Sequence, residues 1–165
     1  TVLSANFEQS SSQSENMSGK FYIQKPGKMR LEYKQGSPLI IVDGKNLIYV
    51  DKKLEQTSYI PLGSTSASIM LKDKISFFDD AVKVLEVKSS KDMNEVSVTS
   101  NKEPGLGQIT FKFKSNKFIG WRTVDAMGIE TEINLSNAKN EQTLDASLFR
   151  YDKPKNYSSE EKIDF

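Results

Sequence analysis

The chain has 165 residues, and its 23 lysines and arginines against 22 aspartates and glutamates give a formal net charge of +1. That length suits one domain with a hydrophobic core of its own, and the balanced charge gives no electrostatic basis for binding nucleic acid. The sequence contains no cysteine and no histidine, which excludes disulfides, thiolate or histidine catalysis and the commonest zinc ligands. We therefore expect no catalytic residue, no metal site and no cofactor.

No apolar stretch reaches the roughly 18 to 20 residues that would span a bilayer, and no signal peptide is visible in this chain. The first twelve residues place Leu3 and Phe7 one helical turn apart, which predicts the end of an amphipathic helix over residues 1–12. A polar loop follows and ends at Gly19.

Strand signals dominate from Gly19 onward. Met29, Leu31 and Tyr33 alternate with charged residues, which is typical of a strand with one buried face. Turn signals such as Pro26-Gly27 and Asp43-Gly44 separate the strands. The predicted strands cover residues 19–24, 28–33, 39–42, 46–50, 55–60, 82–87, 95–100, 107–115, 117–126 and 128–138.

The segment over residues 64–80 has a different pattern. Its apolar residues cluster as they do in short helices, and a Ser-Thr-Ser lead-in supplies N-caps, so we expect one or two helices here. The charged tail over residues 152–165 is expected to be a loop or an edge segment. The sequence thus predicts a single domain over residues 1–165, mainly β with a few helices. We expect one face of its long antiparallel sheet to be polar and helices to cover the other.

At this point the sequence resembles the LolA-type periplasmic lipoprotein carriers, a family of Gram-negative bacteria. The resemblance spans nearly the whole chain, and the order and spacing of its pieces carry it. These pieces are "LSANFEQ" (residues 3–9), "GKFYIQKPGKMRLEY" (19–33), "IIVDGKNLIYVDKKLEQTSY" (40–59), "ITFKF" (109–113), "WRTVDAMGIETEINLS" (121–136) and "LDASLFRYDKPKN" (144–156).

The resemblance implies an unclosed, strongly curved antiparallel β-barrel covered by a helical lid. It also implies a non-enzymatic periplasmic chaperone whose cavity takes the acyl chains of lipoproteins. The implied partners are acylated lipoproteins as cargo, an inner-membrane Lol ABC transporter as donor and an outer-membrane acceptor lipoprotein. We expect the protein to be a monomer.

Two kinds of site residue are expected from the pattern and the resemblance together. The family's lid latch is a basic residue before the proline, which is Lys25 here; lysine lacks the planar fork of arginine, so a latch would be differently made. Arg30, nearby, falls on the polar face and is not assigned this role. The expected cavity residues are Ile23, Met29, Leu31, Tyr33, Tyr49, Ile69, Met70, Leu71, Phe77 and Phe78, and the flexible Met29, Met70 and Met127 suit irregular cargo. Each of them is also compatible with ordinary core packing, and Trp121 is assigned to the core.

Two other functions remain open. The same scaffold would serve an outer-membrane acceptor or another lipid-binding protein, and a protruding apolar loop would favour the acceptor; the sequence offers no obvious one. A β-rich hydrolase would need paired carboxylates on facing strands. Asp51, Asp79 and Asp80 are typical of surface acids in turns, so the carrier hypothesis is preferred.

Overall fold

A computed structural model describes residues 1–74, 76–78 and 80–160. Within these residues, twelve strands form one sheet in the order β12-β6-β5-β4-β3-β2-β1-β11-β10-β9-β8-β7. The strands are β1 (Val2–Ser11), β2 (Met17–Gln24), β3 (Lys28–Tyr33), β4 (Leu39–Asp43), β5 (Asn46–Asp51), β6 (Gln56–Pro61), β7 (Val82–Ser90), β8 (Met93–Ser100), β9 (Gln108–Lys114), β10 (Lys117–Val124), β11 (Glu130–Asn140) and β12 (Ser158–Glu160). The helices are η1 (Leu62–Ser64), α1 (Ala67–Met70), η2 (Pro104–Leu106) and η3 (Ala146–Phe149).

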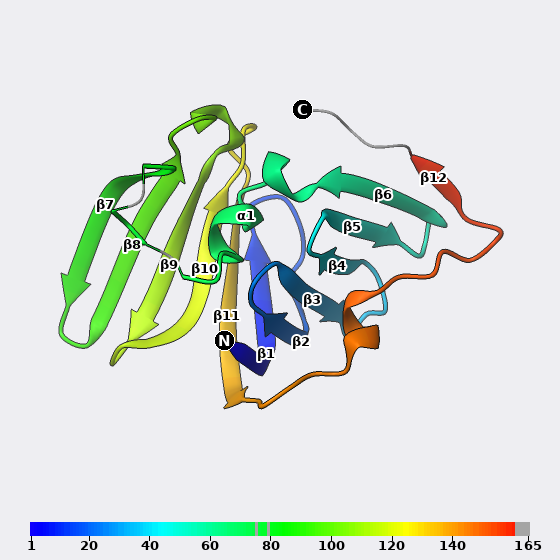
Figure 1. Ribbon diagram of the computed structural model, residues 1–165, viewed down its shortest axis with the longest axis horizontal. Helices are drawn as coiled ribbons and strands as arrows, with labels where there is room; N and C mark the ends of the chain where they lie inside the picture. Colours follow the sequence, from blue (N-terminus) through cyan, green and yellow to red (C-terminus); the bar gives the residue numbers. More distant parts are fainter. Residues whose placement is uncertain (75, 79, 161–165) are drawn as a thin grey trace.

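The sheet is antiparallel except at β12, which runs parallel to β6. Strand β1 pairs with both β2 and β11, and so joins the strands β2–β6 to the strands β7–β11. Figure 1 shows these two groups crossing at a steep angle, with α1 in the angle between them. Strands β7 and β12 end the strand order without pairing to each other, so the curved sheet is not closed. The predicted strands and the predicted fold class are confirmed.

The expected helix over residues 1–12 is wrong, because this segment is strand β1. Residues four apart share a face in a strand as well as in a helix, so the spacing of Leu3 and Phe7 could not distinguish the two. Hydrogen-bonded partners on both sides decide the outcome: Phe7 lies opposite Gly19 of β2 and opposite Leu135 of β11.

The sheet curves where its backbones approach closely. A register shift between Phe118 and Gly120 marks a bulge between β9 and β10. Gly120 has a φ of 147°, and a Cβ there would lie 2.1 Å from the carbonyl oxygen of Ile133. Only glycine therefore permits β10 and β11 to come together at this point.

The main hydrophobic core fills the concave face of the sheet. Its largest fully buried side chains are Phe7, Phe21 and Phe111, from β1, β2 and β9. Buried residues of α1 pack against the same core from the other side. We call this the concave cluster; its buried members are Ala5, Phe7, Phe21, Ile23, Met29, Leu31, Tyr33, Val42, Ile69, Met70, Leu71, Val82, Val98, Ile109, Phe111, Trp121 and Ile133.

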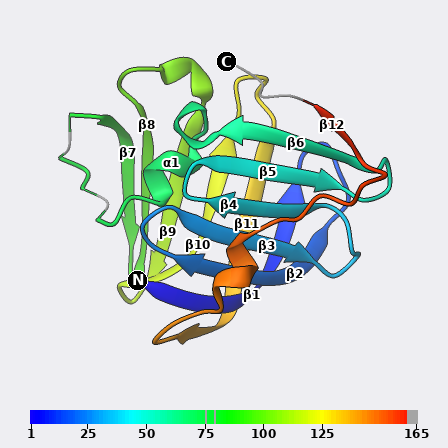
Figure 2. The same cartoon turned by 45° about the vertical axis from the view of Figure 1, so that its right-hand side comes forward.

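The opposite, outer face is not polar throughout, which corrects the sequence expectation. A second core, the outer cluster, consists of Leu39, Ile41, Ile48 and Val50 on β4 and β5. It is covered by residues 141–157, which we call the strap. Figure 2 shows the strap leaving the end of β11, crossing the outer side of the sheet and running on to β12. Consecutive residues of β4 are buried because each of its faces has a cover.

The outer face of β9 also buries a charge. Lys112 is only 5% exposed, and its Nζ donates hydrogen bonds to the Glu132 carboxylate and the Asn134 side chain on β11. A buried ammonium needs such partners, because transfer out of water is costly for an unpaired charge. The apolar alternation of β9 alone did not reveal that its charged face would be covered.

The helical region over residues 64–80 is smaller than expected. It contains the single-turn helix α1, preceded by η1, and continues in turns and bends as far as β7; residues 75 and 79 lie outside the described residues. Leu71 caps the C-terminal end of α1 and is buried in the concave cluster, and the charged residues Lys72, Asp73 and Lys74 follow it. We call residues 67–71 the lid.

Candidate functional site

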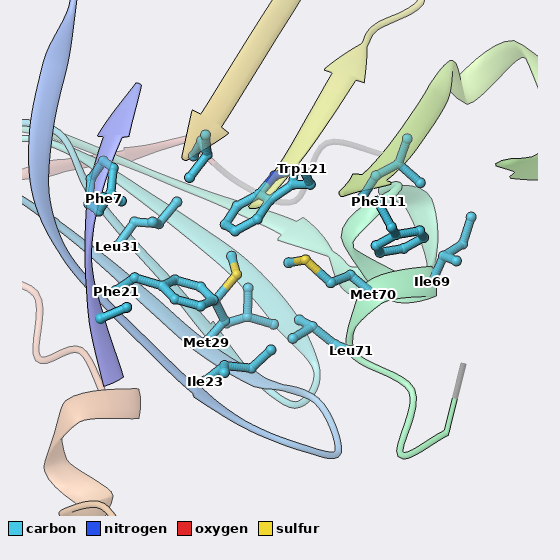
Figure 3. Close-up of a cluster of buried hydrophobic side chains, with 14 of the residues drawn as sticks. Phe7, Phe21, Ile23, Met29, Leu31, Ile69, Met70, Leu71, Phe111 and Trp121 are labelled. Carbon is cyan, nitrogen blue, oxygen red and sulfur yellow. The ribbon is translucent and has the colours of Figure 1, made fainter. Parts of the chain in front are cut away.

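The lid and the β2–β3 hairpin face each other across the concave cluster. Ile23, Met29 and Leu31 point inward from the hairpin and are each 4% exposed. Figure 3 shows Met70 of the lid directed toward Met29, with Trp121 extending toward them from β10. Two flexible methionines and one aromatic ring therefore meet between lid and sheet, an arrangement that can repack around an irregular apolar guest.

The lid is tied to the sheet through backbone atoms. The N–H of Gly27, in the turn between β2 and β3, donates a hydrogen bond of 2.8 Å to the carbonyl oxygen of Leu71. Gly27 has a φ of 78°, a conformation that favours glycine. The Pro-Gly turn recognised in the sequence thus also receives the C-terminal end of α1, where unpaired carbonyl groups are available.

Lys25 lies in the same turn and is half-buried beside the lid. Burial lowers the pKa of its ammonium group, and the charge of Asp73, just after the lid, acts in the opposite direction. The position of Lys25 therefore agrees with the predicted latch, whose role stays a prediction. Its interaction with Asp73 is electrostatic, which differs from a multidentate set of arginine hydrogen bonds.

Tyr33 brings a polar group into the apolar interior. Its hydroxyl donates a hydrogen bond of 2.5 Å to Oε1 of Gln9, and its ring contacts Phe7 edge-on at 5.1 Å between centroids. Burial, with a smaller contribution from Tyr49, raises the pKa of Tyr33 to about 12, while the bond to Gln9 opposes this. The hydroxyl is therefore neutral at ordinary pH and adds no charge to the concave cluster.

The structure brings most of the predicted cavity residues together, although not all of them. Ile69, Met70 and Leu71 are buried against the hairpin, and Phe77 packs on Phe111 with ring centroids 6.1 Å apart. Three residues lie outside this arrangement. Tyr49 is 38% exposed at the margin, whereas Phe78 and Met127 are 98% and 84% exposed and do not contribute to the concave cluster.

Much of the concave face comes from residues that the predicted site left out. Phe21 contacts Trp121 at 5.2 Å between ring centroids, and Phe118 stacks on the same indole at 6.1 Å. The alternation of Ile109 and Phe111 predicted their shared face. What the sequence could not reveal is that β9 and β10 curve round to face β2 and β3.

The described residues contain no group of acidic side chains placed to hold a metal ion. They also contain no helix that is long and apolar enough to cross a membrane. What the site offers chemically is apolar contact area under a short cover, with one neutral hydroxyl and one half-buried cation at its margins.

Comparisons with known proteins agree with this geometry. A family model described as "Outer membrane lipoprotein carrier protein LolA" matches residues 1–152. An outer-membrane lipoprotein carrier protein of Chromobacterium violaceum is 28% identical over 163 residues, covering 93% of this chain and 78% of that protein. A protein of the same name from Methylococcus capsulatus is 27% identical over 141 residues, covering 82% of this chain and 67% of its own length.

A solved structure supports the fold independently of sequence. An uncharacterized conserved protein from Thermus thermophilus aligns with 98% of this chain and 90% of its own, with a TM-score of 0.53. Its sequence identity is only 12%, so the likeness concerns the fold alone. The curved, open sheet is therefore an architecture shared by distant sequences.

Proposed function

Because the chain belongs to the LolA family, we propose that it is a non-enzymatic periplasmic chaperone that carries lipoproteins from the inner to the outer membrane. The family resemblance recognised in the sequence is confirmed by that match. In this proposal the acyl chains of the cargo occupy the concave cluster after the lid has moved away. The donor is an inner-membrane Lol ABC transporter, and the receiver is an outer-membrane acceptor lipoprotein.

The observation that carries the proposal is the short apolar lid that covers the apolar concave face of the sheet. Ile69, Met70 and Leu71 fill the space in front of the β2–β3 hairpin, so cargo has to displace them. Burying three such side chains is worth about 5 to 9 kcal/mol as an upper bound. Each buried CH₂ of an acyl chain gains about 0.8 kcal/mol, so roughly ten methylenes gain about as much as the lid loses.

This near balance is what a carrier needs. A preformed empty cavity would bind acyl chains too tightly for release, whereas a lid that competes for the same surface subtracts its own binding energy from that of the cargo. Lys25 and the hydrogen bond between Gly27 and Leu71 then act as the latch that sets how much is subtracted.

The proposal is tested by releasing an acylated lipoprotein from spheroplasts. The protein is added to spheroplasts that retain the lipoprotein, and the supernatant is assayed for it. We expect release by the unaltered protein, at least fivefold less by Met29→Gln, and unchanged release by the matched variant Met127→Gln, whose side chain is exposed. Failure of the folded, unaltered protein to release lipoprotein would contradict the proposal.

One observation favours a second candidate, an outer-membrane acceptor. Phe78 follows the lid and is 98% exposed, so it is an apolar side chain that could enter a bilayer. An acceptor would transfer lipoprotein to lipid vesicles unaided, and Phe78→Ser would reduce that transfer. A carrier would need a separate acceptor, and Phe78→Ser would not change the release from spheroplasts.

A further inference from the structure

A polar hollow lies on the outer face of β1, β2 and β3, on the opposite side of the sheet from the concave cluster. Its volume is about 710 Å³, and small residues such as Ser18, Gly19 and Gly36 leave room for it. Six charged residues line the hollow, namely Lys20, Arg30, Lys34, Lys52, Glu8 and Glu32. Neither the family match nor the carrier proposal makes use of this feature.

The charges of the hollow are unbalanced. Arg30 and Glu32 pair with each other, with 3.1 Å between Nε and Oε2. In the described part of the chain, none of the ion pairs involves Lys20, Lys34 or Lys52. Three exposed lysines without an ion-pair partner among the described residues therefore line a space whose remaining carboxylate is Glu8, in a protein whose net charge is only +1.

Paired strands fix the backbone of two of these lysines. Lys20 lies within β2, and Lys34 follows β3, where its N–H donates a hydrogen bond of 2.8 Å to the carbonyl oxygen of Ser18. Ser18 and Lys20 point to the same side of β2, so Lys20 and Lys34 are diagonal neighbours. Backbone positions fixed in this way lower the ordering cost of holding a ligand between the two ammonium groups.

We propose that this hollow binds a phosphate-bearing group, either a free phosphate ester or the head group of an anionic lipid. A phosphate supplies the negatively charged partner that these lysines lack, and its oxygens accept hydrogen bonds from ammonium groups and from neutral donors. The side chains of Asn6 and Ser136, which also line the hollow, supply such neutral donors. A ligand here lies on the other side of the sheet from the lid.

The test is a calorimetric titration of the full chain at about 0.15 M salt, where distant surface charges are screened. The soluble probes are inorganic phosphate and sn-glycerol 3-phosphate, and co-sedimentation with phosphatidylglycerol or phosphatidylcholine vesicles tests the lipid source. We expect the double variant Lys20→Gln/Lys34→Gln to weaken binding at least tenfold and Lys20→Arg/Lys34→Arg to retain it. The matched control is Lys114→Gln/Lys117→Gln, which removes the same charge at the exposed β9–β10 turn and should change binding less than twofold.

Each outcome decides the proposal. Co-sedimentation with phosphatidylglycerol vesicles but not with phosphatidylcholine vesicles, together with binding of glycerol phosphate, supports a lipid head group. Binding of the soluble probes without co-sedimentation with either kind of vesicle supports a free phosphate ester. Absence of binding by every probe overturns the site, as does an equal loss in the control variant, which would show only general charge attraction. Trp121 lies in the concave cluster, on the other side of the sheet from the hollow. Its fluorescence emission should therefore stay unchanged when a ligand binds in the hollow, which distinguishes this binding from acyl binding.

Discussion

We expect Lys25 to affect the stability of the closed lid through an electrostatic interaction with Asp73. Its attraction to Asp73 opposes the cost of its burial beside the lid, so removing the charge loosens the lid only moderately. In Lys25→Met we expect an acylated lipopeptide to dissociate about twofold to fivefold more slowly, because a looser lid competes less with cargo. Stopped-flow measurement of dissociation checks this. Asp73→Asn should have the same effect, and unchanged dissociation in both variants would show that Lys25 is not a latch.

Tyr33 makes the stability of the protein depend on alkaline pH. Its pKa is raised to about 12 in the folded chain, above the ordinary value near 10, so the folded state holds the proton more tightly than the unfolded state. Its contribution, about 3 kcal/mol, is full below pH 10 and is lost as the pH rises through 10 toward 12. Urea unfolding at pH 8.5 and 11.5 should show this loss. Tyr33→Phe should be less stable than the unaltered protein at pH 8.5, yet should lose less stability between the two pH values.

Arg30 holds the middle of the strap, which also packs on the outer cluster through Tyr151 and Tyr157. Nη1 of Arg30 donates a hydrogen bond of 3.0 Å to the carbonyl oxygen of Leu148, in η3, while Phe149 is buried beside it. We expect Arg30→Gln to lower the free energy of unfolding by about 1 to 2 kcal/mol, because the part-buried carbonyl loses a charged donor. It should also accelerate proteolysis within residues 141–157. Arg150→Gln makes the same charge change at an exposed strap residue; an equal effect there would contradict a specific anchor.

Elements with strict alternation could be predicted from the sequence, whereas elements fixed by distant contacts could not. Residues 28–33 alternate and are strand β3, with Arg30 on the face opposite Met29 and Leu31 as expected. The N-terminal segment became a strand because β2 and β11 provide partners for it, and its own spacing fits both structures. The outer cluster was missed for a similar reason, since the strap that covers β4 comes from a hundred residues later in the chain.

The candidate site shows the same limit at a larger scale. Met29 and Leu31 could be placed on the apolar face of a strand from sequence alone, and the family resemblance connected that face with the lid. The opposing wall, which includes Trp121 and Phe118, depends on the curvature that β1 and the bulge at Gly120 impose on twelve strands. Sheet curvature results from the sum of many small strand twists and a few bulges, so no local sequence pattern predicts it.

If lid and cargo compete for the concave cluster, a substitution in the lid that lowers the stability of the empty protein must raise its affinity for cargo. Met70→Ala removes lid contacts that exist only in the empty protein, so we expect it to lower the free energy of unfolding of the empty protein by about 2 to 3 kcal/mol. The same loss should appear as tighter binding of an acylated lipopeptide, by roughly 30- to 150-fold, because the cargo displaces a weaker competitor. Thermal unfolding with and without saturating lipopeptide, together with Trp121 fluorescence titration, measures both quantities.

The two cores of the sheet provide the control for this linkage. Ile48→Ala removes a comparable amount of buried surface from the outer cluster, which lies on the opposite face of the sheet from the proposed cargo site. It should destabilise the empty and the loaded protein equally and leave the affinity unchanged. Weaker binding by Met70→Ala would mean instead that the lid contributes contacts to the cargo and holds it, so that release would require a partner to pull the lid away.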